Sequence, residues 1–315
     1  MSDNIRMRTR IFSILLLLFV LFTFGGCDIL FDNFEDWEDD DTPSEPVEPG
    51  EDGDDDNNVL LGIPSEPSLA EGTMLIEHDA YTVLYSYDLL MPVWVSWHLD
   101  ANDSGDLPRP SRFSPDPDIK DEAYQVKHDD YKHSGFARGH MCPDADRNGN
   151  EAMQDETYYT TNIIPQNSSM NSGDWSQLER DLRSFAAAGY ELYIVAGAVQ
   201  GETGGTNSDG EVLKEWKSEE RDVAITVPSQ IWKAFVIIEQ DDSKDDLERI
   251  ANGETPVYAS GIIMDNAPFD GSWEDAVVTI DEIEVLTNLD LFSALPDSIE
   301  MELESGGAAK LPDVA

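Results

Sequence analysis

The most informative stretch of this chain is FARGHMCPDADR, residues 136–147. It contains Arg138 and His140, two side chains suited to phosphate chemistry. A histidine such as His140 has an ordinary pKa of about 6.5 and can accept a proton at neutral pH. Arg138 lies two positions earlier, which places both side chains on one face of an extended strand. Its guanidinium group offers a fork of donors that matches a phosphate. Taken alone, a histidine beside an arginine is more often a structural or surface pair.

Two later stretches, YTTNIIPQN at residues 159–167 and NSGDWSQLE at residues 171–179, add further candidate groups. Asn171 is expected in a loop just before a helix, where its side-chain oxygen could ligate a hard cation. Mg²⁺ prefers such oxygen ligands and often takes only one or two from the protein. Glu179, on the following helix, could hold a water that coordinates the cation. By itself, Asn171 also fits an ordinary turn before a helix.

Three other polar groups of residues 136–147 have simpler interpretations. Cys142 adjoins Pro143, and we expect it to be a small buried residue and not a nucleophile. Asp146 and Arg147 are neighbours in sequence, and we expect them to form a local ion pair.

Together these stretches resemble the DNA/RNA non-specific endonucleases, the Serratia-nuclease and endonuclease G type of the ββα-metal group. That family's motif is Asp-Arg-Gly-His followed by a proline and often Ala-Asp-Arg, then Thr/Ser-Asn-x-x-Pro-Gln, then Asn-x-Gly-x-Trp-x-x-Leu-Glu. The sequence matches this pattern, in order, at Arg138, Gly139, His140, Pro143, Ala145, Asp146, Arg147, Asn162, Pro165, Gln166, Asn171, Gly173, Trp175, Leu178 and Glu179. The resemblance covers roughly residues 75–303. One departure is Ala137, which stands where the motif begins with Asp and faces away from Arg138 on a strand.

The resemblance implies phosphodiester hydrolysis assisted by one Mg²⁺ or Mn²⁺ ion per active site, held by Asn171. In this mechanism His140 is the general base that takes a proton from the attacking water. Arg138 would stabilise the pentacovalent transition state. Glu179 would orient waters around the cation, which neutralises charge on the phosphoryl group and the departing oxygen.

The resemblance also implies DNA and RNA as substrates. Arg109 or Arg112 would reach a neighbouring phosphate, and spacing alone does not choose between them. Asn162 would help Glu179 to orient the waters around the cation and is a further candidate for binding the substrate. Contacts confined to phosphate and sugar carry no base information, so we expect cleavage without sequence preference. The alternatives are a surface lipoprotein that keeps the nuclease scaffold but only binds nucleic acid or metal, and a phosphodiesterase for smaller substrates. No protein partner is inferred.

The apolar pattern predicts an α+β fold with a central, mainly antiparallel sheet flanked by helices, in a single domain over residues 71–305. Strands are predicted at residues 81–87, 92–99, 158–164, 191–199, 223–227, 231–238 and 257–264, the first two joined as a hairpin. Trp175, Leu178, Leu182 and Phe185 predict one face of a helix that starts near Asp174 as N-cap and ends before residue 189. Shorter helices are predicted at residues 281–289 and 297–304.

The first 70 residues are expected to lie outside this domain. Arg6, Arg8 and Arg10 precede an apolar run over residues 11–24, which is typical of a signal peptide and shorter than the roughly 20 residues that span a bilayer. The run ends at Cys27 after two glycines, so we expect residues 1–26 to be a lipoprotein signal and Cys27 to carry the lipid of a membrane anchor. An ordinary signal with an incidental cysteine is the alternative. Residues 27–70 are predicted to be an acidic, disordered tether, and residues 306–315 a flexible tail.

The charge of the chain argues against a polyanionic partner. Its formal net charge is −47, of which residues 28–58 carry −15 and the first 27 residues +2, which leaves −34 for the body. Nucleic acids are bound by Lys and Arg with release of counterions. Two explanations reconcile this charge with a nuclease: the few basic residues gather in the cleft, or the protein works in high salt, where repulsion is screened within about 3 Å at 1 M. Full stability and activity in dilute buffer would exclude the second.

Overall fold

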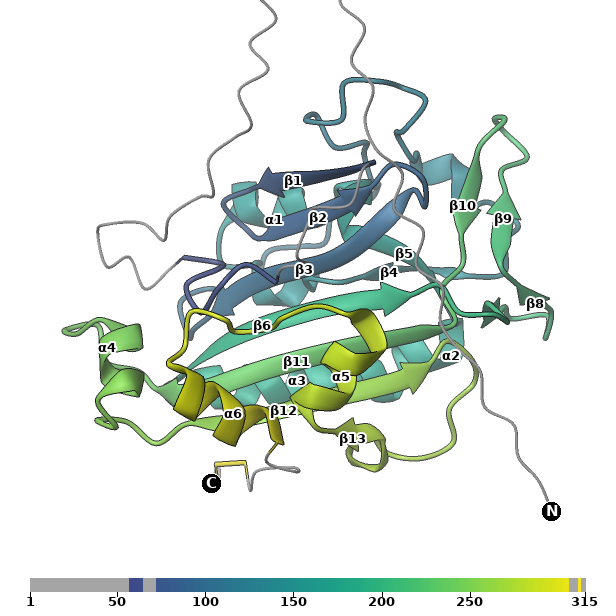
Figure 1. Cartoon of the computed structure of the whole chain (residues 1–315). Helices are drawn as coiled ribbons and strands as arrows, with labels where there is room; N and C mark the ends of the chain where they lie inside the picture. Colours follow the sequence, from purple (N-terminus) through teal and green to yellow (C-terminus); the bar gives the residue numbers. More distant parts are fainter. Residues whose placement is uncertain (1–56, 65–71, 306–310, 313–315) are drawn as a thin grey trace, which may run out of the picture. The chain divides into compact units, whose positions relative to one another are not determined.

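The computed structural model describes residues 57–64, 72–305 and 311–312. In them the predicted α+β architecture is confirmed (Figure 1). A seven-stranded sheet has the order β1-β2-β3-β6-β11-β12-β13, with every neighbouring pair antiparallel. Its strands are β1 (Thr73–Glu77), β2 (Thr82–Ser86), β3 (Met91–Leu99), β6 (Tyr190–Val199), β11 (Gln230–Glu239), β12 (Tyr258–Asp265) and β13 (Val277–Val278).

Smaller elements surround this sheet. Three two-stranded ribbons pair β4 (Ala137–His140) with β5 (Ile163–Gln166), β7 (Gly205–Thr206) with β8 (Val212–Leu213), and β9 (Glu215–Lys217) with β10 (Ala224–Thr226). The α-helices are α1 (Glu151–Thr157), α2 (Ser168–Ser172), α3 (Asp174–Ala187), α4 (Asp246–Ala251), α5 (Ile280–Thr287) and α6 (Asp297–Ser305). Four 3₁₀ turns are η1 (His128–Tyr131), η2 (Asp144–Asp146), η3 (Thr160–Asn162) and η4 (Trp273–Ala276).

Both faces of the sheet are covered, and β11 shows how the sequence achieves this. Side chains alternate between the two faces of a strand. Ile231 and Phe235 join the core that contains the apolar face of α3. Trp232 and Val236 join a second core, to which α5 contributes Ile283. In Figure 1, α5 and α6 lie in front of the sheet and α3 lies behind it. Because β11 is buried on both faces, its sequence is an almost continuous apolar run.

Helix α3 follows the predicted pattern. Its four periodic residues, Trp175, Leu178, Leu182 and Phe185, are all buried. Gly189 then adopts φ +92°, a left-handed conformation that glycine tolerates without strain and that ends the helix. The N-cap prediction was wrong by one residue, because the N-cap is Gly173 and Asp174 begins the helix.

Residues 158–164 do not form the single strand that was predicted. They pass through the 3₁₀ turn η3 and enter β5 only at Ile163. Helices α1, α2 and α4 were also not predicted. They are five to seven residues long, too short for a helical period to show, and side-chain caps define them instead: Asn150 accepts hydrogen bonds from two backbone N–H groups at the start of α1.

Part of the predicted tether packs against the folded domain. Residues 57–64 were assigned to the tether, yet Leu60 and Leu61 are buried in the core beneath α5. The Asn58 carbonyl accepts a hydrogen bond from Ser96 Oγ at 2.6 Å. The predicted signal peptide, Cys27 and most of the predicted tail lie outside the described residues. Within those residues, no helix is long and apolar enough to cross a membrane.

Candidate active site

The β4–β5 ribbon carries the motif that the sequence singled out. Arg138 pairs with Pro165, Gly139 with Ile164 and His140 with Ile163. Gly139 is required by close packing, since a Cβ atom there would lie 1.9 Å from Gln166 Oε1. The ribbon lies on the same side of the sheet as α3, because Ile164 belongs to the core that includes this helix.

His140 is held by aromatic rings and not by hydrogen bonds. Its ring lies 5.2 Å from the Phe113 ring and 5.0 Å from the Tyr158 ring, centroid to centroid. Its Nε2 is buried and makes no hydrogen bond among the described residues. Burial lowers the pKa of His140 to about 4, although the nearby Asp144 carboxylate opposes the shift. The imidazole is therefore neutral at pH 7, which is the form that accepts a proton.

Arg138 is positioned by the 3₁₀ turn η1. Its Nε and Nη2 donate to the carbonyl of His128, at 3.1 and 2.7 Å. Its guanidinium carbon lies 5.5 Å from the Tyr131 ring centroid and 5.9 Å from that of Phe113. The side chain is half-buried, and Nη1 makes no hydrogen bond in the described part of the chain. The fork is thus oriented through two of its nitrogens, and the third remains available to an anion.

The two arginines that were predicted as alternatives for a phosphate contact, Arg109 and Arg112, both lie near the motif. Arg109 Nε lies 3.1 Å from Asp144 Oδ2, and the Arg109 side chain is 73% exposed. Its charge lowers the pKa values of both His140 and Glu179, so it lies near both groups. Arg112 is 63% exposed, pairs with Asp129 at 3.3 Å, and acts on Arg138 instead. Exposed cations therefore gather around the motif despite the acidic body.

Asn171 and Glu179 lie on consecutive helices. Asn171 lies in α2 and not in a loop, and its half-buried side chain makes no hydrogen bond to any residue that the structure describes. The Glu179 side chain is 14% exposed, with Oε1 3.9 Å from Lys233 Nζ. Burial raises the pKa of Glu179 to about 7, opposed by the Lys233 charge. An amide oxygen without a partner and a partly desolvated carboxylate suit a hard divalent cation.

The expected role of Asn162 in the bound complex is wrong. Its side chain is fully buried, and both its amide nitrogen and its amide oxygen form hydrogen bonds inside the protein. Nδ2 donates to the carbonyls of Cys142 and Thr157, each at 2.9 Å, and Oδ1 accepts from the Cys142 backbone at 2.9 Å. Asn162 fixes the turn after His140. Cys142 is buried as expected, and burial raises the pKa of its thiol.

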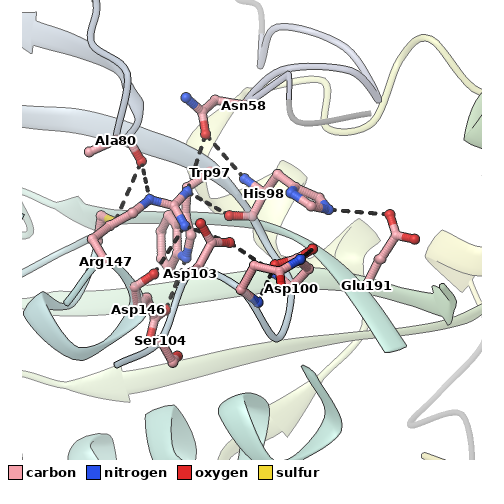
Figure 2. Close-up of polar contacts among 12 residues, drawn as sticks. Asn58, Ala80, Trp97, His98, Asp100, Asp103, Ser104, Asp146, Arg147 and Glu191 are labelled. Atoms are coloured by element: carbon pink, nitrogen blue, oxygen red, sulfur yellow. Dashed lines mark hydrogen bonds and ion pairs between the residues drawn. The ribbon is translucent and has the colours of Figure 1, made fainter. Parts of the chain in front are cut away.

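The expected ion pair between Asp146 and Arg147 is also wrong, because the two side chains face different partners. Asp146 pairs with Arg183 at 2.6 Å and accepts from Trp97 Nε1 at 3.0 Å. Arg147 pairs with Asp103 at 3.0 Å (Figure 2). Asp146 ends the 3₁₀ turn η2 and Arg147 follows it, so their side chains point in different directions although they are adjacent in sequence.

Tertiary packing adds groups that the motif did not identify. Asp144 accepts from Gln154 Nε2 at 2.9 Å and lies close enough to His140 to raise its pKa. Lys233, beside Glu179, comes from the middle of a core strand. In the sequence, only its position inside an otherwise apolar run marks Lys233 as unusual.

A second cluster with metal-ligating groups lies at His78, Asp116 and Asp118, whose ligand atoms lie within 4.8 Å of one another. Asp116 Oδ2 already pairs with His78 Nε2 at 2.9 Å and accepts from Thr161 Oγ1 at 2.6 Å. These groups satisfy one another, which indicates a structural ion pair. The unpartnered Asn171 fits a cation better.

Comparison with known proteins shows which family this chain belongs to. Residues 66–298 match the model of the DNA/RNA non-specific endonucleases. The chain belongs to this family. The nuclease of Nostoc sp. is 31% identical over 251 residues, which cover 79% of this chain and 85% of that protein. The nuclease of Serratia marcescens is 26% identical over 261 residues, with 79% and 85% covered.

The fold agrees with this assignment. A chain in the crystal structure of the EndoG/EndoGI complex superposes with a TM-score of 0.60 at 21% identity, covering 80% of this chain and 96% of that one. Family membership makes this endonuclease a nucleic-acid hydrolase.

Proposed function

We propose that this endonuclease hydrolyses phosphodiester bonds of DNA and RNA without sequence preference and with the help of one divalent cation. The observation that carries the proposal is the neutral, ring-held His140, with the free nitrogen of Arg138 on the same ribbon. A base, an oriented cation and an unpartnered oxygen ligand are the parts that phosphoryl transfer to water requires.

The residues divide the work as follows. His140 takes a proton from the water that attacks phosphorus, and Arg138 neutralises charge that develops on the phosphoryl oxygens. Arg109 holds a neighbouring phosphate from its exposed position beside Asp144. Asn171 would hold Mg²⁺ or Mn²⁺, with Glu179 orienting water near it. When bound, this ion supplies Lewis-acid neutralisation of the phosphoryl group and the leaving oxygen.

The test is cleavage of supercoiled plasmid and of RNA by the purified full-length chain, with Mg²⁺, with Mn²⁺ and with excess chelator. We expect both substrates to be degraded to short products, and the chelator to stop the reaction. A protein that retards nucleic acid on a gel but never cleaves it would support the binding-only alternative instead. Cleavage of small phosphodiesters alone would indicate the other alternative, a phosphodiesterase for smaller substrates.

We further propose that the chain is exported and anchored to a membrane by lipid on Cys27. The basic residues, the apolar run and the following glycines support this proposal. Radiolabelled fatty acid should enter the wild-type chain in a bacterial host and be absent from Cys27→Ser. Equal labelling of both chains would reject the anchor.

A further inference from the structure

Lys233 is a buried lysine that the mechanism above leaves without a role. It lies in the middle of β11, opposite Ala196 of β6 and Ile262 of β12. Its side chain is 0% exposed, on the sheet face that packs against α3. Its Nζ makes no hydrogen bond among the described residues. A buried ammonium group without hydrogen bonds is costly, so its presence in a core strand calls for a reason.

Two indole rings fix the position of this ammonium group. Nζ lies 4.8 Å from the Trp175 ring centroid and 5.1 Å from that of Trp97, within the range of cation–π attraction. Trp97 is itself held in place, because its Nε1 donates to Asp146 (Figure 2). The lysine is therefore centred by rings from β3 and α3, and its charge remains to act on an anion.

That anion is Glu179. Its Oε1 lies 3.9 Å from Lys233 Nζ, and it is the one carboxylate within ion-pair distance of this lysine in the described part of the chain. Glu179 follows Trp175 by one turn of α3, so a single helical turn supplies both a ring and the carboxylate. No hydrogen bond to the Glu179 side chain is found among the described residues. Lys233 is its nearest fixed partner.

The fold itself does not need this charge. Replacing a buried ion pair by apolar groups of similar volume is often neutral or stabilising. A methionine would fill the same space between the two rings at lower cost. The position of Lys233, behind a candidate carboxylate and sealed from solvent, instead matches the outer residues that orient the groups around a metal.

We propose that Lys233 is a positioning residue, which holds the Glu179 carboxylate in place at the edge of the site formed by His140 and Asn171. The inference rests on the proposed function, because the task of Glu179 belongs to it. Lys233 touches neither substrate nor solvent, so it acts only through Glu179.

The test compares Lys233→Met, Glu179→Gln and the double variant in steady-state plasmid cleavage. We expect Lys233→Met to lower kcat about 10- to 100-fold. KM should stay close to wild type, since the lysine cannot reach nucleic acid. The double variant should be no slower than Glu179→Gln alone, because the lysine acts through the carboxylate. The melting temperature of the double variant should equal or exceed that of wild type. Lys244→Met, which removes a surface lysine paired with Glu254, is the matched control and should be fully active.

A second readout does not depend on cleavage. Mn²⁺ should raise the melting temperature of wild type, and Lys233→Met and Glu179→Gln should reduce this rise to the same extent. Wild-type kcat in Lys233→Met, or losses that multiply in the double variant, would overturn the proposal. If wild type cleaves nothing, the proposed function fails by itself and the Mn²⁺ measurement decides about Lys233. An undiminished rise in Lys233→Met, or no rise in wild type, then overturns the proposal.

Discussion

Two buried polar regions of this endonuclease lie side by side and differ in how their charges are satisfied. In the first, Arg147 is 2% exposed and every part of its guanidinium group has a partner. It donates to the carbonyls of Ala80 and His98, at 2.8 and 2.6 Å, and to Asn58 Oδ1 at 3.3 Å. Asp103 supplies the opposite charge (Figure 2).

The second region surrounds the candidate active site and leaves its groups without such partners. His140 Nε2 and Lys233 Nζ are buried and make no hydrogen bond in the part of the chain that the structure describes. Their pKa values, with that of Glu179, are displaced by burial toward the neutral forms. A satisfied network stabilises a fold, whereas unpartnered buried groups cost free energy and mark a site where a ligand can supply the missing interactions.

The largest effect that tests this contrast is the loss of the proposed base, His140. We expect His140→Ala to lower kcat about 10²- to 10⁴-fold, the usual contribution of a general base. Thermal melting should change far less than kcat, because Ala loses the ring contacts to Phe113 and Tyr158 but no hydrogen bond of Nε2 to the described residues. His133→Ala is the control, because His133 is 74% exposed and pairs with Glu219 outside the motif. Undiminished cleavage by His140→Ala would remove this residue from the mechanism.

The next effect concerns the hydrogen bonds and the ion pair around Arg147. Arg147→Met should lower the free energy of unfolding by about 3–5 kcal/mol, because it leaves Asp103 and several buried acceptors without a partner. Urea denaturation measures this loss. The folded fraction of the Arg147→Met variant should still cleave DNA. Arg180→Met, on the exposed side of α3, should change stability by less than about 0.5 kcal/mol. Equal effects of the two variants would mean that the buried network adds nothing.

Removal of the proposed metal ligand should have an intermediate effect. Asn171→Ala is expected to raise the Mg²⁺ concentration for half-maximal cleavage at least about tenfold, which corresponds to ~1.4 kcal/mol. Stability should stay close to wild type, since no described residue bonds to this side chain. The neighbouring Ser172→Ala serves as control, and an unchanged metal requirement in Asn171→Ala would assign the ligand elsewhere.

The smallest effect concerns stability against pH. The native pKa of His140, about 4, lies below its ordinary value of 6.5, so the unfolded chain binds the extra proton between these values and the native protein does not. The contribution of His140 is therefore fully present above pH 6.5 and falls as the pH decreases toward 4. Urea denaturation at pH 7 and pH 5 should show a smaller decrease for His140→Gln than for wild type. Equal decreases would mean that the pKa of His140 is not lowered in the native protein.

Much of the site could be predicted because its residues lie close together in sequence. Arg138 and His140 share a four-residue strand, and Glu179 lies on a helix whose apolar period is plain. Asn162 shows the limit of this reasoning. It matched the motif as well as Asn171 did, but the turn η3 buries its amide against Cys142 and Thr157.

The sequence by itself determined the family, the antiparallel sheet and helix α3, and it singled out His140 as the candidate base, since alternation, helical period and motif order are local properties of the chain. Only the tertiary structure decided which polar groups are satisfied. Hydrogen-bond partners and burial come from segments far apart, as Asn58 does for Arg147 and Lys233 does for Glu179. For the same reason the sequence did not reveal that Leu60 and Leu61, which lie in the predicted acidic tether, belong to the core.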